Sequence, residues 1–405
     1  MGGFLFMNYS LYFHIPFCAH RCAYCDFNTY AGQEDSIPFY VTTLCKEVEL
    51  VGRRFPAGNK IHTIFFGGGT PSLLSPQQFE STFHSLRGHF DLTDTNEVTI
   101  EANPGTVSLE QLKKLHDIGI NRISFGVQSA NMEELQMLER AHDFFDVIRS
   151  VSWARQAGFD NLNLDLIYGL PEQTLLVWQS TIRRILDLQP DHISAYALTL
   201  EHGTPFGRWA SRGLLPRPDP DLAADMYEWA DEVFESAGYV HYEISNWAKP
   251  NRECIHNLQY WRALPYLGLG AGAHGYANGY RYSNVLRIKT YIDRLAPVDG
   301  QIPSIEFPFS PATVNRHGQT LQDDMSEFMI TGLRLTGEGV NASTFGQRFG
   351  SKLTDIYGAE IDELIQLGLL EWNKMTSEAE GASEVLRLTA RGRLLGNQVF
   401  IRFVA

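Results

Sequence analysis

Short apolar runs alternate with longer amphipathic segments through the first half of the chain. Strands are predicted for the apolar runs Leu11–Pro16, His62–Gly69, Glu97–Pro104, Arg122–Ser129, Asn161–Pro171 and His192–Leu200. Helices are predicted for the segments with helical spacing at Ile37–Arg54, Gln77–His89, Leu109–Ile118, Met132–Gln156, Leu175–Leu188 and Asp221–Ser236. These strand–helix repeats predict a parallel sheet with helices on its outer face, because parallel strands need crossover connections.

The later part of the chain lacks this alternation. Residues 297–311 are rich in proline and serine and are predicted to form a linker. Residues 323–405 are predicted to form a small helix-rich domain, with a turn or strand pair around Leu386–Leu388. We therefore expect three parts, which are residues 1–240, residues 241–296 and residues 297–405.

Composition narrows the class of protein. A chain of 405 residues exceeds the usual size of one core, which favours one large domain and a smaller one. Its 44% hydrophobic and 20% charged residues are typical of a soluble globular protein. The formal charge of -14 argues against nucleic acid as a partner, because phosphate contacts call for clustered lysine and arginine.

No segment has the roughly 18 uninterrupted apolar residues of a membrane span, and the N-terminus lacks the features of a signal peptide. We expect a cytoplasmic protein without a transmembrane segment.

Three of the five cysteines lie close together in the stretch YFHIPFCAHRCAYCDF. Cys18, Cys22 and Cys25 have the spacing C-x3-C-x2-C, directly after an apolar run that is predicted to be a strand. Closed zinc sites take four protein ligands, whereas three thiolates on an iron–sulfur cubane leave one iron open to an outside ligand. A partial zinc site, or three thiols packed near a turn, is the alternative. The motif resembles that of the radical S-adenosylmethionine (SAM) enzymes, in which the open iron of a [4Fe-4S] cluster chelates SAM.

A glycine-rich segment follows the second predicted strand, in the sequence FFGGGTPS. Consecutive glycines at Gly67, Gly68 and Gly69 let the backbone bend sharply and approach a ligand closely, although a tight structural turn would use them equally well. The segment stands one crossover after the cysteines. In that position it is similar to the glycine motif that holds the amino group of SAM in the radical SAM family.

Polar residues lie in or near the carboxyl-terminal parts of three further predicted strands, at the edge where ligands bind in such sheets. Glu101 is a carboxylate that could bind the hydroxyls or the ammonium group of SAM, and Gln128 ends the next strand. Arg140 could grip a carboxylate with two hydrogen bonds. Asp165 lies inside an apolar strand, where a carboxylate is costly unless it is paired or faces a ligand. Each alone could be a surface or capping residue, but their joint placement favours a ligand site.

The motifs together resemble one branch of the radical SAM proteins, the coproporphyrinogen-oxidase-like HemN/HemW group. The phrases that carry the resemblance are HIPFC, the cysteine motif, FFGGGTPS, EANP, SFGVQS, LDLIYGLP and GLGAGAH, and it runs from Tyr12 to the end of the chain. It implies an α/β fold, a partial (β/α)6 TIM-like barrel with a smaller winged-helix-like C-terminal domain. It also implies SAM contacts from Tyr12, Gly68, Gly69, Thr70, Glu101, Gln128, Arg140 and Asp165, with a further contact near Thr199.

Two functions compete within this group. The oxygen-independent coproporphyrinogen III oxidases of porphyrin biosynthesis carry a further cysteine two residues after the third cluster ligand, where this chain has Phe27. They also have a long N-terminal extension, whereas only 17 residues precede Cys18. Both differences count against the oxidase, which converts coproporphyrinogen to protoporphyrinogen IX.

A second motif favours the heme chaperones of the group. The segment HNLQYW matches their HNxxYW signature with His256, Asn257, Tyr260 and Trp261. A neutral imidazole is a competent axial ligand for heme iron, and flat aromatic side chains can cover a porphyrin. The alternative is that His256 is a packed, hydrogen-bonded residue, and Cys254 could be a second soft ligand.

The resemblance thus implies a cytoplasmic heme chaperone with a [4Fe-4S] cluster on Cys18, Cys22 and Cys25, bound SAM, and heme at His256. Its expected partners are acceptor hemoproteins, including membrane-bound respiratory enzymes that would bring it to the membrane periphery, and a low-potential electron donor such as flavodoxin or ferredoxin. The rival hypotheses are the coproporphyrinogen dehydrogenase and a SAM-binding cluster protein that acts on another substrate.

Overall fold

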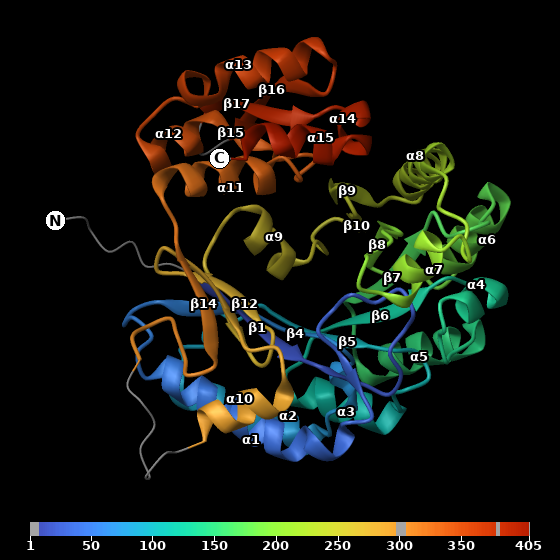
Figure 1. Cartoon of the computed structure of the whole chain (residues 1–405), viewed down its shortest axis with the longest axis vertical. Coiled ribbons are helices and arrows are strands. Elements are labelled where there is room, and N and C mark those ends of the chain that lie inside the picture. The colour runs from blue at the N-terminus through green and yellow to red at the C-terminus, as the bar shows by residue number, and fades with distance from the viewer. Residues whose placement is uncertain (1–7, 297–304, 378–380, 405) are drawn as a thin grey trace. The chain divides into compact units, whose positions relative to one another are not determined.

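A computed structural model describes residues 8–296, 305–377 and 381–404, which form two compact units (Figure 1). The first unit is Met1–Val233 with Pro265–His317, and the second is Phe234–Leu264 with Gly318–Ala405. The three-part division expected from the sequence stays a prediction, and residues 297–304 of the expected linker lie outside the described residues. By its contacts, the segment that contains HNLQYW belongs to the second unit.

Six parallel strands form the centre of the first unit, and their order in space is their order in the chain. They are β1 (Asn8–Ile15), β4 (Lys60–Gly68), β5 (Glu97–Ala102), β6 (Arg122–Gln128), β7 (Leu162–Tyr168) and β8 (His192–Ala197). Each overlaps a predicted strand, so the predicted parallel sheet is confirmed. The strands are mostly buried, as expected for a sheet with both faces covered.

Helices connect these strands and cover the outer face of the sheet (Figure 1). They are α1 (Ile37–Gly52), α2 (Pro76–His89), α3 (Leu109–Ile118), α4 (Met132–Met137), α5 (Phe144–Ala157) and α6 (Leu175–Leu186). Two further helices, α7 (Pro205–Ser211) and α8 (Pro220–Ser236), follow β8. Local sequence sets their ends. Ser75 and Gln78 form a capping box at the start of α2, and Gly119 adopts a left-handed conformation after α3.

One predicted helix, Met132–Gln156, is in fact two. Helix α4 ends because Glu139 takes a positive φ of 54°, and α5 begins after Asp143, whose side chain forms a capping box with Asp146. Arg140 therefore lies in the loop between the two helices and not on a helix. This loop follows the carboxyl end of β6.

The other edge of the sheet extends beyond β1 with strands that the sequence did not predict. They are β11 (Tyr266–Leu269), β12 (His274–Ala277), β13 (Tyr280–Asn284) and β14 (Thr313–Gly318), and helix α10 (Ile288–Leu295) packs with α1. Their order is β14-β13-β12-β11-β1, with β11 parallel to β1. Two short strands, β2 (Phe17–Cys18) and β3 (Tyr30–Ala31), flank the cysteine loop.

Glu47 on α1 joins this edge to the rest of the first unit. Its side chain is 1% exposed and accepts four hydrogen bonds of 2.6 to 2.9 Å. The donors are Gly270 N, Asn284 Nδ2, Tyr291 Oη and Ser310 Oγ. Burial raises the pKa of the Glu47 carboxyl even though these donors act to lower it.

Replacing Glu47 with Leu is expected to destabilise the protein strongly, because the buried donors lose their acceptor. The loss in free energy of unfolding should be about 4 kcal/mol, measured by urea denaturation. The control is Glu49→Leu on the same helix, since the Glu49 side chain forms a surface ion pair with Arg53. Equal stability of the two variants would contradict the assigned role of Glu47.

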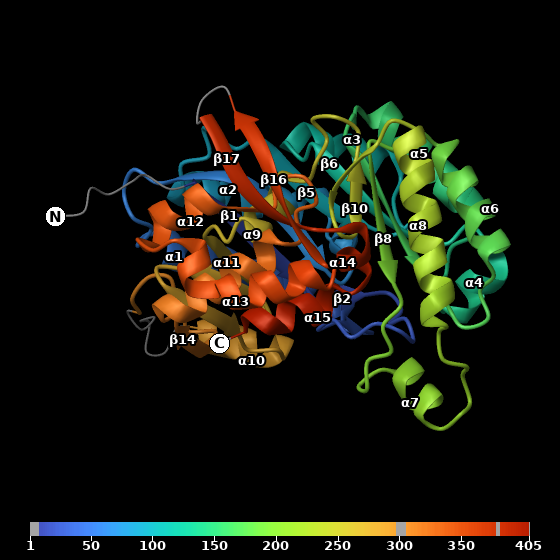
Figure 2. The same cartoon turned by 90° about the horizontal axis from the view of Figure 1, so that it is seen from above.

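Residues 321–388 of the second unit have the order of helices and strands of a winged-helix domain. The second unit contains β9 (Val240–Glu243), β10 (Asn246–Ala248), α9 (Ile255–Trp261), α11 (Leu321–Gly332), β15 (Val340–Asn341), α12 (Ala342–Phe349), α13 (Leu353–Gln366), β16 (Leu370–Ser377), β17 (Gly381–Leu388), α14 (Ala390–Leu394) and α15 (Gly396–Phe400). Strands β16 and β17 form a long hairpin, with the order β15-β17-β16 (Figure 2). The predicted winged-helix-like domain is confirmed, and the expected strand pair around Leu386–Leu388 is this hairpin.

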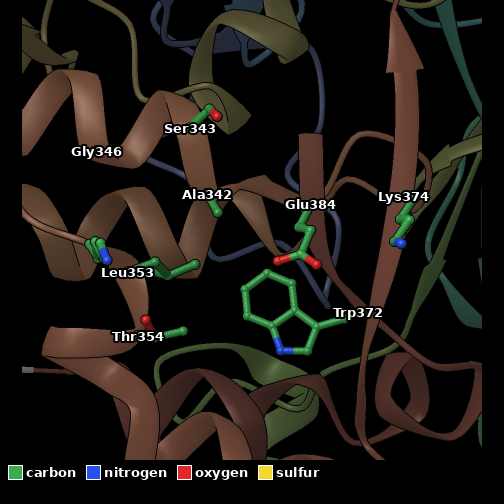
Figure 3. A pocket seen from close by; sticks show the side chains of 9 residues that line it. Ala342, Ser343, Gly346, Leu353, Thr354, Trp372, Lys374 and Glu384 are labelled. Atoms are coloured by element: carbon green, nitrogen blue, oxygen red, sulfur yellow. The ribbon is translucent and has the colours of Figure 1, made fainter. Parts of the chain in front are cut away.

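A groove of about 570 Å³ lies between the hairpin and the first turns of α12 and α13 (Figure 3). The Trp372 indole lies beside the carboxylate of Glu384, and Leu353 and Thr354 stand opposite. The cations among the residues that line the groove are Lys352 and Lys374. This lining lacks the dense positive charge that binding to a nucleic-acid backbone requires.

Candidate functional site

A cavity of about 470 Å³ opens in the first unit at the carboxyl ends of the parallel strands. Among the residues that line it are all three clustered cysteines and every predicted SAM residue except Tyr12, namely Cys18, Cys22, Cys25, Gly68, Gly69, Thr70, Glu101, Gln128, Arg140 and Asp165. Thr199 lines it as well. The structure thus brings together residues that lie more than 140 positions apart in the sequence.

Tyr12 is the predicted residue that the cavity lining does not include. Its hydroxyl lies 3.0 Å from Nδ1 of His14, and the other ring nitrogen of His14 lies 2.9 Å from the carbonyl oxygen of Asn28. Tyr12 therefore supports the strand and loop that carry the cysteines.

The three cysteines lie on one tight loop that lines one side of the cavity. Within this loop the Cys25 amide donates a hydrogen bond to the Cys22 carbonyl over 3.1 Å. Burial raises the pKa of the Cys18 and Cys25 thiols. Within the described part of the chain, no three His, Cys, Asp or Glu side chains are grouped around a position for a single metal ion. A cubane cluster binds each thiolate through a different iron atom, so thiols spread around a cavity fit a cluster better than they fit zinc.

The glycine-rich segment packs against the cysteine loop. The Gly69 amide donates to Ile15 O and the Thr70 amide to Phe17 O, over 2.9 and 2.7 Å. A Cβ on Gly69 would lie only 2.5 Å from Phe17 O. A Cβ on Gly68, whose φ is 110°, would collide with the ring of His14. These glycines are therefore required by contacts within the protein, in addition to any contact with a ligand.

Two half-buried carboxyl groups, those of Glu101 and Asp165, line the cavity. Asp165 accepts hydrogen bonds from Ser124 and Asn163 over 2.7 and 2.8 Å, and Glu101 accepts one from the Gly68 amide over 2.9 Å. Burial, followed by the negative charge of Asp165, raises the pKa of Glu101 to about 7. Burial also raises the pKa of Asp165. Two desolvated acids favour a cationic ligand, and SAM carries a sulfonium and an ammonium group.

Arg140 reaches the cavity from the loop between α4 and α5. Its Nη1 donates to Cys22 Sγ over 3.4 Å, and its Nη2 donates to Asn103 Oδ1 and Gly126 O over 2.5 and 2.7 Å. The Nε atom is buried without a hydrogen-bond partner. Arg140 would have to exchange some of these bonds to grip a ligand carboxylate with two of its nitrogens, as the sequence predicts.

Sequence reasoning missed several residues of this cavity. Asn103 and Ser124 lie in or just beyond strands whose ends were recognised, yet neither was singled out. The available signal for Asn103 was its place directly after a buried strand, two positions beyond Glu101. Phe27 also lines the cavity and is 64% exposed, which the sequence could not indicate.

The HNLQYW segment forms α9 in the second unit, where its side chains have protein partners. His256 is 1% exposed, and its Nε2 lies 2.8 Å from Tyr260 Oη. The guanidinium of Arg334 lies 4.2 Å from the centre of a Trp261 ring and forms an ion pair of 2.9 Å with the buried Glu243. The Trp261 ring and the His256 imidazole thus already have partners within the protein. Cys254, at the N-cap of α9, is fully buried, and Asn257 is half-buried.

Comparisons with known proteins agree with this geometry. The model of the radical SAM superfamily matches residues 12–185, and that of the HemN C-terminal domain matches residues 319–395. The chain is 38% identical to the heme chaperone HemW of Bacillus subtilis over 397 residues, 98% of this chain and 99% of that one. It is also 38% identical to the heme chaperone HemW of Lactococcus lactis, over 98% of this chain and 97% of that one. The solved structure of coproporphyrinogen III oxidase (HemN) from Escherichia coli, described as a radical SAM enzyme, matches with a TM-score of 0.80 and 25% identity, over 98% of this chain and 90% of that one.

Proposed function

The chain belongs to the HemW family of radical SAM proteins, and on this premise we propose that it is a heme chaperone, which binds heme and delivers it to hemoproteins. The observation that carries the proposal is the near-complete alignment with relatives named as heme chaperones. The resemblance expected from the motifs is confirmed by these matches.

Membership of the superfamily implies a [4Fe-4S] cluster and SAM, and the cavity fits both. We assign Cys18, Cys22 and Cys25 as the cluster ligands, because the cavity gathers them around one space. The cluster would supply an electron to SAM when both are bound. The protein would contribute the carboxyl groups of Glu101 and Asp165 for the cationic groups of SAM, the glycine-rich backbone, and the hydrogen bonds that hold the cysteine loop.

We assign the heme site to His256, supported by the match to the HNxxYW signature. The hydrogen bond to Tyr260 would have to open before Nε2 could bind iron. Heme binding would then be coupled to a rearrangement of α9. Cys254 is a weaker candidate because it lies outside the HNxxYW motif, at the N-cap of that helix.

The oxidase remains the second candidate function, because the HemN structure covers nearly the whole chain. Phe27 occupies the position of the further cysteine of the oxidases, and its exposed ring offers no thiolate there. The deciding experiment gives the anaerobically reconstituted protein heme and coproporphyrinogen III in parallel. We expect heme to be bound and passed to an apo-hemoprotein. Formation of protoporphyrinogen would contradict the chaperone.

Partners and location follow from this role. We propose that acceptor hemoproteins, among them membrane-bound respiratory enzymes, receive heme from a chaperone that works in the cytoplasm and meets the membrane through them. Among the described residues, the helices are too short or too polar to cross a bilayer. A flavodoxin or ferredoxin would supply the electron for the cluster.

SAM binding should become tighter as pH rises through about 7. Below that pH Glu101 is protonated, because burial raises its pKa to about 7, and a cationic ligand favours the ionised form. Affinity should therefore rise about tenfold between pH 6 and pH 8 through this group. The measurement compares SAM titrations of the reconstituted protein and Glu101→Gln. The amino group of SAM titrates in both proteins, so only the difference between the two profiles reports Glu101. Parallel profiles would refute the assignment.

A further inference from the structure

A continuous path of hydrogen bonds joins two of the three cysteines across the cavity. It runs from Cys18 Sγ to Thr70 Oγ1 over 3.7 Å and from Thr70 Oγ1 to Asn103 Nδ2 over 2.9 Å. It continues from Asn103 Oδ1 to Arg140 Nη2 over 2.5 Å, and from Arg140 Nη1 to Cys22 Sγ over 3.4 Å. Asn103 is the central member of this path, and the family assignment gives it no role.

The chemistry of the groups fixes the direction of each bond. Arg140 can only donate, so the oxygen of the Asn103 amide must face it and the NH₂ group must face Thr70. The Thr70 hydroxyl accepts from that NH₂ group, which leaves its own hydrogen for Cys18 Sγ. Both ends of the path therefore donate to sulfur.

The backbone holds Asn103 in this orientation. Its carbonyl accepts hydrogen bonds from the Thr106 amide and hydroxyl over 3.2 and 2.7 Å, which closes the turn that follows β5. The side chain is thereby held between the glycine-rich segment and the Arg140 loop. Small shifts of either segment would break the path.

We propose that Asn103 is a positioning residue that makes Thr70 and Arg140 donate hydrogen bonds to two cluster-binding sulfurs, and so raises the reduction potential of the cluster. The inference rests on the cluster ligands assigned under the proposed function. Hydrogen bonds to cysteine sulfur stabilise the more negative, reduced state of a cluster, and their loss lowers its potential.

The test is an anaerobic redox titration of the reconstituted protein, without SAM, in which the reduced cluster is followed by electron paramagnetic resonance. Asn103→Asp keeps an acceptor for Arg140 but cannot donate, so the Thr70 hydroxyl turns to the new carboxylate and leaves Cys18. Thr70→Val removes the same donor without adding charge, and Asn103→Ala deletes the centre of the path. For each variant we expect the ratio of reduced to oxidised cluster, at the midpoint potential of the parent, to fall at least threefold.

The matched control is Asn121→Asp. The side-chain amide of Asn121 likewise bridges two groups, here the backbone atoms Val98 N and Asn96 O, over 2.8 and 2.9 Å, but it stands at the opposite ends of β5 and β6. Asn121→Asp carries the same added charge as Asn103→Asp, and its cluster should have the midpoint potential of the parent.

Midpoint potentials of Asn103→Asp and Asn103→Ala that equal that of the parent would overturn the inference, whatever happens to thermal stability. A midpoint potential that is lowered in Thr70→Val but in neither Asn103 variant would also overturn it, because Thr70 would then donate to Cys18 without help from Asn103. A parent protein that assembles no cluster would overturn the ligand assignment and the inference together, and it is recognised before any variant is compared.

Discussion

Replacing Cys22 with Ala is expected to abolish assembly of the [4Fe-4S] cluster. Two thiolates cannot hold a cubane that normally takes three protein ligands in this family, and Arg140 also loses its sulfur acceptor. Changes to residues that merely orient a metal ligand already lower metal affinity by 10 to 100 times, so loss of a ligand should reduce bound iron by more than about tenfold. Iron content and visible absorption after anaerobic reconstitution measure the effect.

The control for this variant is Cys45→Ala. Cys45 is a half-buried cysteine on α1 that does not line the cavity, so its variant should keep the full cluster signal. If Cys22→Ala retains the signal, or if Cys45→Ala loses it, the assignment of Cys18, Cys22 and Cys25 is wrong. Fluorescence melting of both variants shows whether a loss of iron is a loss of fold.

Replacing His256 with Ala is expected to weaken heme binding by about tenfold or more, because the proposed axial ligand is removed. The structure suggests a second variant, Tyr260→Phe, for which heme binding is expected to become tighter. Tyr260→Phe removes the 2.8 Å hydrogen bond at Nε2 and should tighten heme binding about fivefold, which corresponds to one hydrogen bond of about 1 kcal/mol. Heme titrations followed by the Soret band give both affinities.

The pair of variants distinguishes ligation from packing. His84→Ala, which removes an exposed histidine on α2, should bind heme like the parent. If His256 merely packs α9, His256→Ala would lower stability and leave the heme spectrum unchanged, and Tyr260→Phe would not raise the affinity. Heme binding that is equal in all four proteins would place the axial ligand elsewhere.

The parallel sheet could be predicted because its strands are apolar on both faces and are separated by helices of ordinary length. Alternation of that kind leaves few topologies open. The cavity residues could be predicted for a related reason, since parallel strands end at one edge and any polar residue there is conspicuous. Glu101, Gln128 and Asp165 were found in this way, and all three line the cavity.

What the sequence missed depends on the particular contact that each residue makes within the fold. The break after α4, which places Arg140 in a loop, comes from a capping box at Asp143 inside an otherwise periodic helical segment. The sequence leaves open whether the glycines serve a ligand or a structural turn, and only the structure shows that the backbone of Phe17 and the ring of His14 already demand Gly69 and Gly68. The partner of His256 is its own neighbour Tyr260, one helical turn away. Residue types alone could not decide between a ligand and a partnered side chain.

The second unit is assembled from two stretches of chain, residues 234–264 and 318–405, which are separated in the sequence by residues 265–317 of the first unit. Trp261, from the earlier stretch, stacks on Arg334, from the later one. Chimaeras between members of the family should therefore be cut at three junctions, after residues 233, 264 and 317, so that both stretches come from the same parent. A hybrid that exchanges only the C-terminal stretch would join mismatched halves of one core, and we expect such hybrids to be poorly expressed even when each parent is soluble.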